Sequence, residues 1–241
     1  MGSSGGTIVI TADRHEVAQA LHWDDSSGSD FFFEPDAAGI SGTGQAEDLS
    51  DVGWTVTSIL GFVQGTAGDF FGSADITPNH YSTDAAADKL ESPNVFADYL
   101  HSQQAAHHLG ADPTTLTMEA WAQFSVTSAS ETGTAIGFFI GGGSIVTEAD
   151  HVAAIHTDGT NFICREGGGD TDTGALDDES WHLFKIVIST GSVTDAIEWF
   201  IDGTSQGTLD RRTDAYPCGW GAGNSTTNRI QIGPCRIFYR V

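Results

Sequence analysis

The chain has 241 residues, of which 39% are hydrophobic and 10% aromatic, enough for one large β domain or two small ones. Its 33 acidic residues outnumber 9 lysines and arginines, which gives a formal net charge of -24 at pH 7. Nucleic acids and anionic membranes are bound through basic surfaces, so this charge argues against both as partners. It indicates a soluble, self-repelling chain, or a surface that attracts cations or a basic partner.

Residues 1–35 are predicted to form an N-terminal arm. Residues 13–23 have the spacing of an amphipathic helix, 24–30 have the composition of a loop, and 31–33 are three phenylalanines. The phenylalanines are typical of a short buried strand or an anchoring plug. The start of the chain lacks the pattern of a signal peptide, and no stretch approaches the roughly 18 apolar residues of a membrane span.

The middle of the chain is less regular. Residues 54–63 have a strand-like pattern, and 69–72 are a second, shorter candidate. Residues 73–113 are polar and rich in histidine and alanine, with a short helix expected over 93–106. We interpret 73–113 as a long irregular excursion of the same domain, or alternatively as a contact surface, because long loops are often functional.

From residue 116 onward the sequence predicts strands joined by tight turns. Residues 117–126 alternate with a period of two, which is typical of a half-buried strand. Strands are also expected at 183–189 and 197–201, and a final pair at 229–233 and 236–240. Asp-Gly pairs at 158–159 and 202–203 mark hairpin turns, because these residues tolerate positive φ angles.

Five segments carry a family pattern: LTMEAWAQF, SWHLFKIVIS, IEWFIDG, YPCGW and the terminal RIQIGPCRIFYRV. They resemble the concanavalin A-like, laminin-G-like jelly-roll domains of tailed-virus structural proteins. In that pattern Trp121 is the central aromatic of an early strand, Trp181 and Phe184 begin a W-x-x-F-K-I strand, and Trp199 begins a W-F-I-D-G hairpin. The resemblance covers about residues 110–241. It concerns packing positions, and so implies a fold more directly than an activity.

The resemblance implies an all-β fold, a two-sheet antiparallel jelly-roll sandwich of the concanavalin A-like type. The sandwich would span residues 36–241, preceded by the arm at 1–35 and interrupted by the irregular region at 73–113. As a function it implies a virion structural protein, with a capsid decoration protein on the head exterior as the leading hypothesis. The alternative is a carbohydrate-binding, lectin-like fibre or spike module that recognises a host surface glycan.

In the decoration hypothesis the partner is the major capsid protein. The arm and the 73–113 region would bridge neighbouring capsid subunits, in an interface of about 1,200–2,000 Å² if it is of standard size. A homo-oligomer is expected, most naturally a trimer, because oligomers favour closed symmetry.

Catalytic patterns are missing from the sequence, which predicts a protein that is not an enzyme. A glycoside hydrolase needs paired carboxylates, but Glu119 stands alone on its strand and the acidic residues 177–179 fall in an expected loop. The glycine run 141–143 before Ser144 lacks the G-x-S-x-G pattern and is better interpreted as a flexible turn. Cys164 lies in a strand pattern and is expected to be a buried, inert thiol.

Metal-binding patterns are weak. Asp24, Asp25 and Asp30 form an oxygen-rich loop that predicts a calcium site, although their spacing does not match an EF-hand. Histidines 101, 107 and 108 lack a recurrent ligand spacing and are expected on the surface. The cysteines (Cys164, Cys218 and Cys235) do not form a zinc set, and three buried free thiols are expected. Cys218 and Cys235 could pair only if their strands meet.

Tryptophans are the candidates for glycan binding, because an indole can stack on a sugar ring. Four of the six fall in strand patterns and are expected in the core. Trp23 and Trp220 fall in loop-like contexts, so they are the candidate glycan-binding residues, Trp220 being the better one. A structural role for Trp220 is the competing interpretation.

Overall fold

The structure is a computed structural model that describes residues 30–33, 55–57, 60–63, 78, 80–83, 88–92, 114–125, 131–167, 169–189, 191–213, 218–224 and 229–240. Its strands are β1 Asp30–Phe33, β2 Thr55–Thr57, β3 Leu60–Val63, β4 His80–Ser82, β5 Lys89–Glu91, β6 Thr115–Ser125, β7 Glu131–Ile140, β8 His151–Thr157, β9 Asn161–Arg165, β10 Thr171–Leu176, β11 His182–Ser189, β12 Ile197–Ile201, β13 Thr204–Leu209, β14 Cys218–Asn224 and β15 Arg229–Arg240. A single turn of 3-10 helix, η2 Glu148–Asp150, precedes β8. None of the helices in these ranges is long and apolar enough to cross a membrane.

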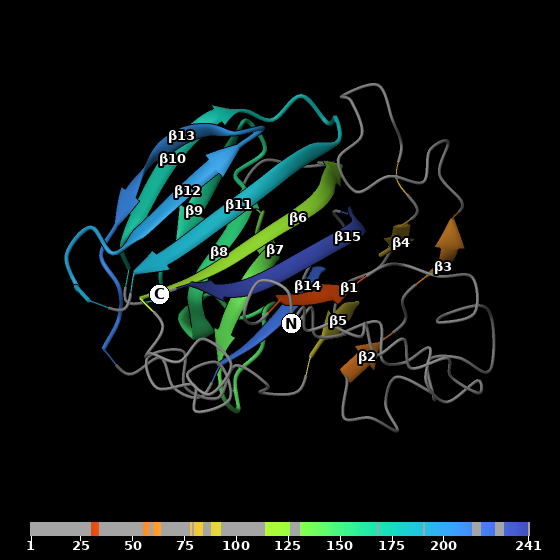
Figure 1. Cartoon of the computed structure of the whole chain (residues 1–241). Helices are drawn as coiled ribbons and strands as arrows, with labels where there is room; N and C mark the ends of the chain where they lie inside the picture. The colour runs from red at the N-terminus through yellow and green to blue at the C-terminus, as the bar shows by residue number, and fades with distance from the viewer. Residues whose placement is uncertain are drawn as a thin grey trace, which may run out of the picture.

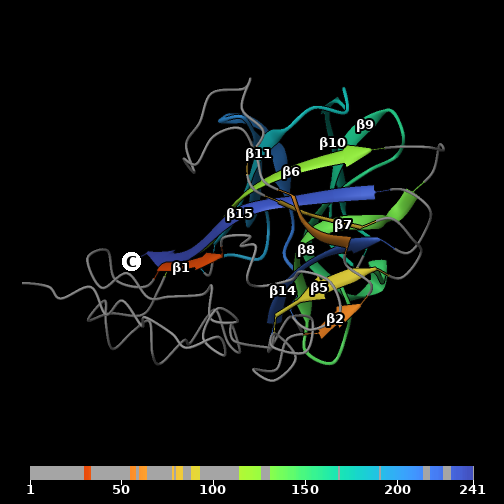
Figure 2. The same cartoon turned by 90° about the vertical axis from the view of Figure 1, so that its right-hand side faces the viewer.

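The described strands form two antiparallel sheets packed face to face, which confirms the predicted jelly-roll sandwich (Figure 1). Sheet A has the order β13-β12-β11-β6-β15-β4-β3, with β1 also paired to β15, and sheet B has the order β10-β9-β8-β7-β14-β5-β2. In Figure 1 sheet A faces the viewer and sheet B lies behind it. The two layers are seen from the side in Figure 2.

The alternating pattern of residues 117–126 places β6 at the centre of sheet A. Met118, Ala120, Ala122 and Phe124 are fully buried between the sheets, as the pattern predicts. β6 pairs with β11 on one side and β15 on the other. The alternate side chains therefore form the outer face of sheet A, where Glu119 lies opposite Lys185.

Large aromatic side chains from both sheets fill the core. Trp199 from β12 and Trp220 from β14 are fully buried. Phe124 and Phe184 from sheet A meet Phe162 from sheet B edge to face, with ring centroids 5.0–5.8 Å apart. Such pairs favour this geometry because the edge of one ring is electropositive and the face of the other electronegative.

Strand pairing corrects two sequence predictions and confirms a third, the short strand expected at 31–33. The predicted pair at 229–233 and 236–240 is one strand, β15, with an irregularity between Ile232 and Cys235. The 73–113 region is not wholly irregular, because it supplies β4 to sheet A and β5 to sheet B. The end of the predicted arm is the strand β1, which lies along the C-terminal part of β15 (Figure 2). The helices expected at 13–23 and 93–106 lie outside the described residues.

The turns and thiols follow their sequence predictions. Asp202 and Gly203 have φ angles of 49° and 80° and join β12 to β13 in a two-residue hairpin. The turn between β8 and β9 is closed by the Asp158 carboxylate, which accepts the N–H groups of Thr160 and Asn161. All three cysteines are buried and free: Cys164, Cys218 and Cys235. Cys218 is in sheet B and Cys235 in sheet A, and both are free, as predicted.

Candidate functional site

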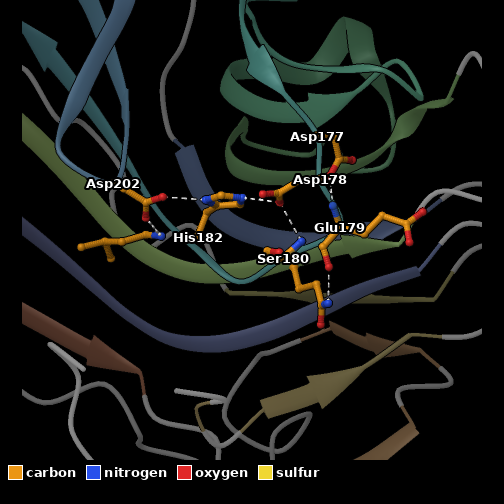
Figure 3. Close-up of polar contacts among 8 residues, drawn as sticks. Asp177, Asp178, Glu179, Ser180, His182 and Asp202 are labelled. Carbon is orange, nitrogen blue, oxygen red and sulfur yellow. Dashed lines mark hydrogen bonds and ion pairs between the residues drawn. The ribbon is translucent and has the colours of Figure 1, made fainter. Parts of the chain in front are cut away.

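Chemically capable side chains gather at the loop that crosses from sheet B to sheet A, between β10 and β11. His182 is the first residue of β11, and its imidazole lies between two carboxylates (Figure 3). Asp178 comes from the crossover loop, and Asp202 from the turn between β12 and β13. These three residues, the His182 latch, therefore connect the crossover loop to the edge of sheet A.

Both ring nitrogens of His182 make short contacts. Nδ1 lies 2.6 Å from Oδ2 of Asp202, and Nε2 lies 2.9 Å from Oδ1 of Asp178. A carboxylate only accepts hydrogen bonds, so each nitrogen has to donate, and a neutral imidazole has only one N–H. The geometry therefore requires the charged imidazolium. Asp202 also accepts the N–H of Leu183 through its other oxygen, at 2.9 Å.

The surroundings of His182 combine an apolar floor with an acidic rim. Its ring packs against Phe162, with centroids 5.3 Å apart. Burial lowers the pKa of His182, but the hydrogen bonds and charges of Asp202 and Asp178 raise it by more, so the net shift is upward. The hydrogen bond from His182 in turn lowers the pKa of Asp178. The carboxylates themselves are largely exposed, at 59% for Asp178 and 50% for Asp202.

Further contacts hold the crossover loop at both ends. On the sheet B side, Asp177 donates its N–H to the carbonyl of Thr160, at 2.9 Å. On the sheet A side, the side-chain amide of Gln123 donates to the carbonyl of Glu179. Burial raises the pKa of Asp177, whose Oδ1 accepts the N–H of Glu179. The loop is thus fixed to both sheets, and the latch is one part of this network (Figure 3).

The hydrogen bonds of the latch join the crossover loop to sheet A. A general base needs an unprotonated nitrogen, but both nitrogens of His182 are engaged as donors. A histidine activates a nucleophile, such as a hydroxyl or a thiol, that lies within hydrogen-bond distance of its ring. Among the described residues, the atoms that form hydrogen bonds with the His182 ring are carboxylate oxygens. The latch therefore holds the crossover loop against sheet A.

The change His182→Phe tests the latch, because phenylalanine keeps a ring against Phe162 and removes both N–H groups. Folded-state stabilisation by a raised histidine pKa is fully present below the unfolded pKa of about 6.5 and is lost as the pH rises through the folded value. We expect His182→Phe to lower the melting temperature by about 2–4 °C at pH 6, corresponding to about 1 kcal/mol for partly exposed pairs. Melting curves from pH 5.5 to 9 should show this difference shrinking as the pH rises. A constant difference would contradict the ionic role.

A second polar cluster lies on the outer face of sheet B. Glu91 from β5 accepts hydrogen bonds from the Ser144 hydroxyl and, at 2.8 Å, from the N–H of Ile145. Lys89 lies 2.8 Å from Glu91 and donates to the Ser144 hydroxyl at 3.0 Å. Ser144 belongs to the strap, residues 141–147, which includes the predicted glycine turn and folds back over β14. A Cβ at Gly221 would meet Ile145 at 3.2 Å, a tight contact, so glycine lets the strap pack closely on β14.

Ser144 and Lys89 tether the strap to β5. Lys89 donates to the Ser144 hydroxyl, which in turn donates to the Glu91 carboxylate. The nearby backbone donors that could form an oxyanion hole are also engaged. The N–H of Ser144 donates to Asp150 at 2.9 Å, and that of Ile145 donates to Glu91. These contacts fasten the strap to sheet B.

Two buried histidines, His151 and His156, lie on β8, and the first of them contacts the strap. Nε2 of His151 contacts the carbonyl of Ile145 at 2.7 Å. Within the described residues, Nδ1 of His151 and both ring nitrogens of His156 have no hydrogen-bond partner. Burial lowers the pKa of each histidine from 6.5 to about 4, with nearby positive charge adding to the effect. Both histidines are therefore neutral at pH 7.

Of the predicted site residues, the structure describes Trp220 and the backbone of Asp30. Trp220 is fully buried on β14, so it is a core residue and cannot offer a face to a sugar ring, which corrects the glycan-binding prediction. Asp30 opens β1, where its backbone lies opposite Phe238. Trp23, Asp24 and Asp25 lie outside the described residues, so the calcium loop remains a prediction. In the described ranges no three histidine, cysteine, aspartate or glutamate side chains come together as metal ligands.

The latch was not predicted, although each of its members was noted separately. Asp178 was assigned to an acidic loop and Asp202 to a turn, and His182 appeared only within the SWHLFKIVIS segment. The signal that could have found two of them is the hairpin register, because pairing Phe184 with Ile201 puts Leu183 beside Asp202. The position of Asp178 depends on the crossover between sheets, which no local pattern encodes.

The sequence matches no family model and no curated protein. Among solved structures it is similar to the conserved carbohydrate esterase of the Shiga toxin-encoding bacteriophage phi24B, with 13% identity over 80% of this chain and 93% of that chain and a TM-score of 0.47. The Emp46p carbohydrate recognition domain, potassium-bound, has 12% identity over 91% and 100% of the two chains and a TM-score of 0.48. A Trypanosoma rangeli sialidase has 12% identity over 76% of this chain and 31% of that chain, with a TM-score of 0.48. Enzymes and a carbohydrate recognition domain both occur in this set, so it does not separate the two functions.

Proposed function

We propose that the chain is a non-catalytic structural protein of a tailed-virus particle, attached to the capsid exterior as a decoration protein. The observation that supports this most directly is that its chemically capable side chains hold the sandwich together. His182 pins the crossover loop, Ser144 and Lys89 fasten the strap, and Cys164 is fully buried with its thiol pKa raised by burial. These contacts hold the sandwich together as a rigid scaffold. In this proposal the strands, and not the polar side chains, have the structural role on the capsid.

The family pattern supports the same proposal. Trp121, Phe184 and Trp199 are all buried or nearly so within sheet A, where the resemblance to virion jelly-roll domains places them. The net charge of -24 suits a protein on the outside of a particle better than one in contact with packaged DNA. The partner in this proposal is the major capsid protein, and a trimer remains the most natural oligomer because it matches a symmetry axis.

Co-sedimentation with capsids assembled without this protein tests the proposal. We expect saturable binding at a stoichiometry that matches a capsid symmetry axis, together with a higher melting temperature of the capsid, because binding to the folded shell stabilises it. An equal mass of an unrelated acidic protein is the control for trapping in the pellet. Absence of saturable binding would overturn the decoration proposal.

A carbohydrate-binding fibre or spike module is the alternative. The burial of Trp220 removes one of its two candidate residues, and the other, Trp23, lies outside the described residues. A glycan screen with the purified chain separates the two proposals. Specific glycan binding without capsid binding would replace the decoration role with the lectin-like one.

A further inference from the structure

The strap closes a small apolar cluster on the outer face of sheet B, where β8, β7, β14 and β5 are successive neighbours (Figure 2). Ile145 of the strap is fully buried against Ala135, Phe139 and Ala154, apart from the main core between the sheets. A Cβ at Gly219 would lie 2.7 Å from Phe139, so glycine on β14 makes room for the cluster. Ile145 is therefore the inner, apolar side of the strap.

His151 and His156 lie beside this cluster on β8. In the pairing of β7 with β8, His151 is opposite Phe139 and His156 is opposite Ala135. Nε2 of His151 lies 2.7 Å from the carbonyl oxygen of Ile145, and it has to donate because a carbonyl only accepts hydrogen bonds. Within the described residues, Nδ1 of His151 has no hydrogen-bond partner. A second proton on that ring would therefore be buried without an acceptor.

The charges around His151 also oppose its protonation. Burial is the main reason that the pKa of His151 falls to about 4; the hydrogen bond to the strap partly offsets this, and Arg165 and Arg212 lower the pKa further. The nearby carboxylates are paired with these cations: Glu148 lies 2.9 Å from Arg165, and Glu166 lies 3.5 Å from Arg212. A charged ring at His151 therefore needs water to stabilise it.

His156 has a lowered pKa for similar reasons. Burial is the largest cause of its pKa of about 4, His151 and Arg165 lower it further, and Asp158 acts in the opposite direction. Its ring makes no hydrogen bond to the strap within the described residues, whereas that of His151 does. The contact with the strap therefore singles out His151 as the group whose charge acts on it.

Side-chain contacts join the strap to sheet B. Glu91 accepts hydrogen bonds from the Ser144 hydroxyl and from the N–H of Ile145. Lys89 donates to the same hydroxyl, and Asp150 accepts the N–H of Ser144. By contrast, β8 is paired along its backbone with β7 on one side and β9 on the other. Lifting the strap therefore brings water to the buried ring at a lower cost in hydrogen bonds than separating β8 from its neighbours.

We propose that the strap is an acid-released lid, in which protonation of His151 lifts residues 141–147 and uncovers the apolar cluster before the sandwich unfolds. The closed strap keeps a second proton off the ring, whereas an open strap lets water solvate the imidazolium, so protons favour the open state. Above pH 6.5 neither state binds this proton, and the strap stays closed. Between pH 6.5 and about 4 only the open state binds it, so the opening equilibrium rises by up to about tenfold per pH unit. The inference is independent of the capsid role.

Hydrogen exchange read by mass spectrometry tests the lid in the full chain. Exchange rates of peptides from the strap and from β6 are followed from pH 7.5 to 4.5 and divided by their intrinsic rates at each pH. We expect the protection of the strap to fall by up to about 100-fold between pH 6.5 and 4.5, while β6 stays protected. His151→Gln is the matched variant, because its side-chain amide can donate to the Ile145 carbonyl and does not titrate. Its strap should stay protected over the same range.

Three results would contradict the lid. A wild-type strap that stays protected down to pH 4.5 would show that it does not open. An equal loss of protection in His151→Gln would assign the opening to the carboxylates of Glu91 and Asp150. Simultaneous loss in the strap and β6 would be unfolding of the whole sandwich.

Should His151→Gln fail to fold, NMR of the wild-type histidine rings replaces it. The ring of His151 should take up its proton over the same pH range in which the strap loses protection. Protonation of His151 beneath a strap that is still protected would overturn the proposal.

Discussion

Acidification from pH 6.5 to pH 4 is expected to remove a large part of the stability of this fold through two neutral histidines. His151 and His156 are buried on β8, and the pKa of each is lowered from 6.5 to about 4. Above pH 6.5 neither state of the chain binds these protons. Between pH 6.5 and 4 only the unfolded chain does, so stability falls by up to about 3 kcal/mol for each histidine. This is substantial beside the roughly 5–15 kcal/mol of a typical domain.

Denaturant titrations at pH 8, 6, 5 and 4 measure this effect. His156→Leu should behave like the wild type or better at pH 8, because the buried ring nitrogens of His156 make no hydrogen bond within the described residues. At pH 4 to 5 the variant should be the more stable protein by about 2–3 kcal/mol. His182→Phe is the control, since His182 has a raised pKa and stabilises the fold throughout this acidic range. If the free energy of unfolding fell equally on acidification in His156→Leu and the wild type, His156 would not be a cause of the acid sensitivity.

Trp220→Ala is expected to lower the free energy of unfolding by about 3–5 kcal/mol, the usual range for truncating a fully buried tryptophan. The indole lies between the sheets on β14, where its neighbours on the strand, Cys218 and Ala222, are also buried. Trp220→Phe fills more of the space and should cost about half as much or less. Denaturant unfolding of both variants at pH 7.5 measures the difference. A cost below about 1 kcal/mol for Trp220→Ala would mean that the indole is not in the core.

The same pair of variants guards against a false result in a glycan screen. Loss of glycan binding in Trp220→Ala would follow from unfolding alone, so it would say nothing about contact with sugar. Trp220→Phe keeps the fold and removes the indole. Binding that survives in Trp220→Phe would agree with a core position, whereas binding lost in a stable Trp220→Phe would contradict it.

The alternation of β6 shows how much of the fold local pattern can predict. Met118, Ala120, Ala122 and Phe124 are all on the buried side because side chains alternate across a strand, whatever its neighbours. Asp202 and Gly203 were predicted as a hairpin turn for an equally local reason, their tolerance of positive φ. By contrast β15 was divided into two strands, because a glycine and a proline at 233–234 suggest a turn that the pairing with β6 overrides.

Local sequence patterns could not predict the shortest strands or the position of Trp220. Three-residue strands such as β4 and β5 carry too little periodicity to be recognised within the 73–113 region. Trp220 was expected in a loop because glycines surround it. The structure shows instead that Gly219 and Gly221 line the outer side of β14, leaving Trp220 on the core side. These glycines are explained by close packing, against Phe139 at Gly219 and against the strap at Gly221, and not by flexibility.

The sequence alone therefore determined the all-β class, the central strands, the tight turns, the buried thiols and the strongly acidic surface, because composition and period-two alternation are local properties. Tertiary structure alone decided which acidic residues meet His182 and that Trp220 lies in the core. The physical reason is that register and sheet crossover bring together residues such as Asp178 and Asp202, which are separated along the chain. Those pairings are set by the packing of two whole sheets, and no single segment carries them.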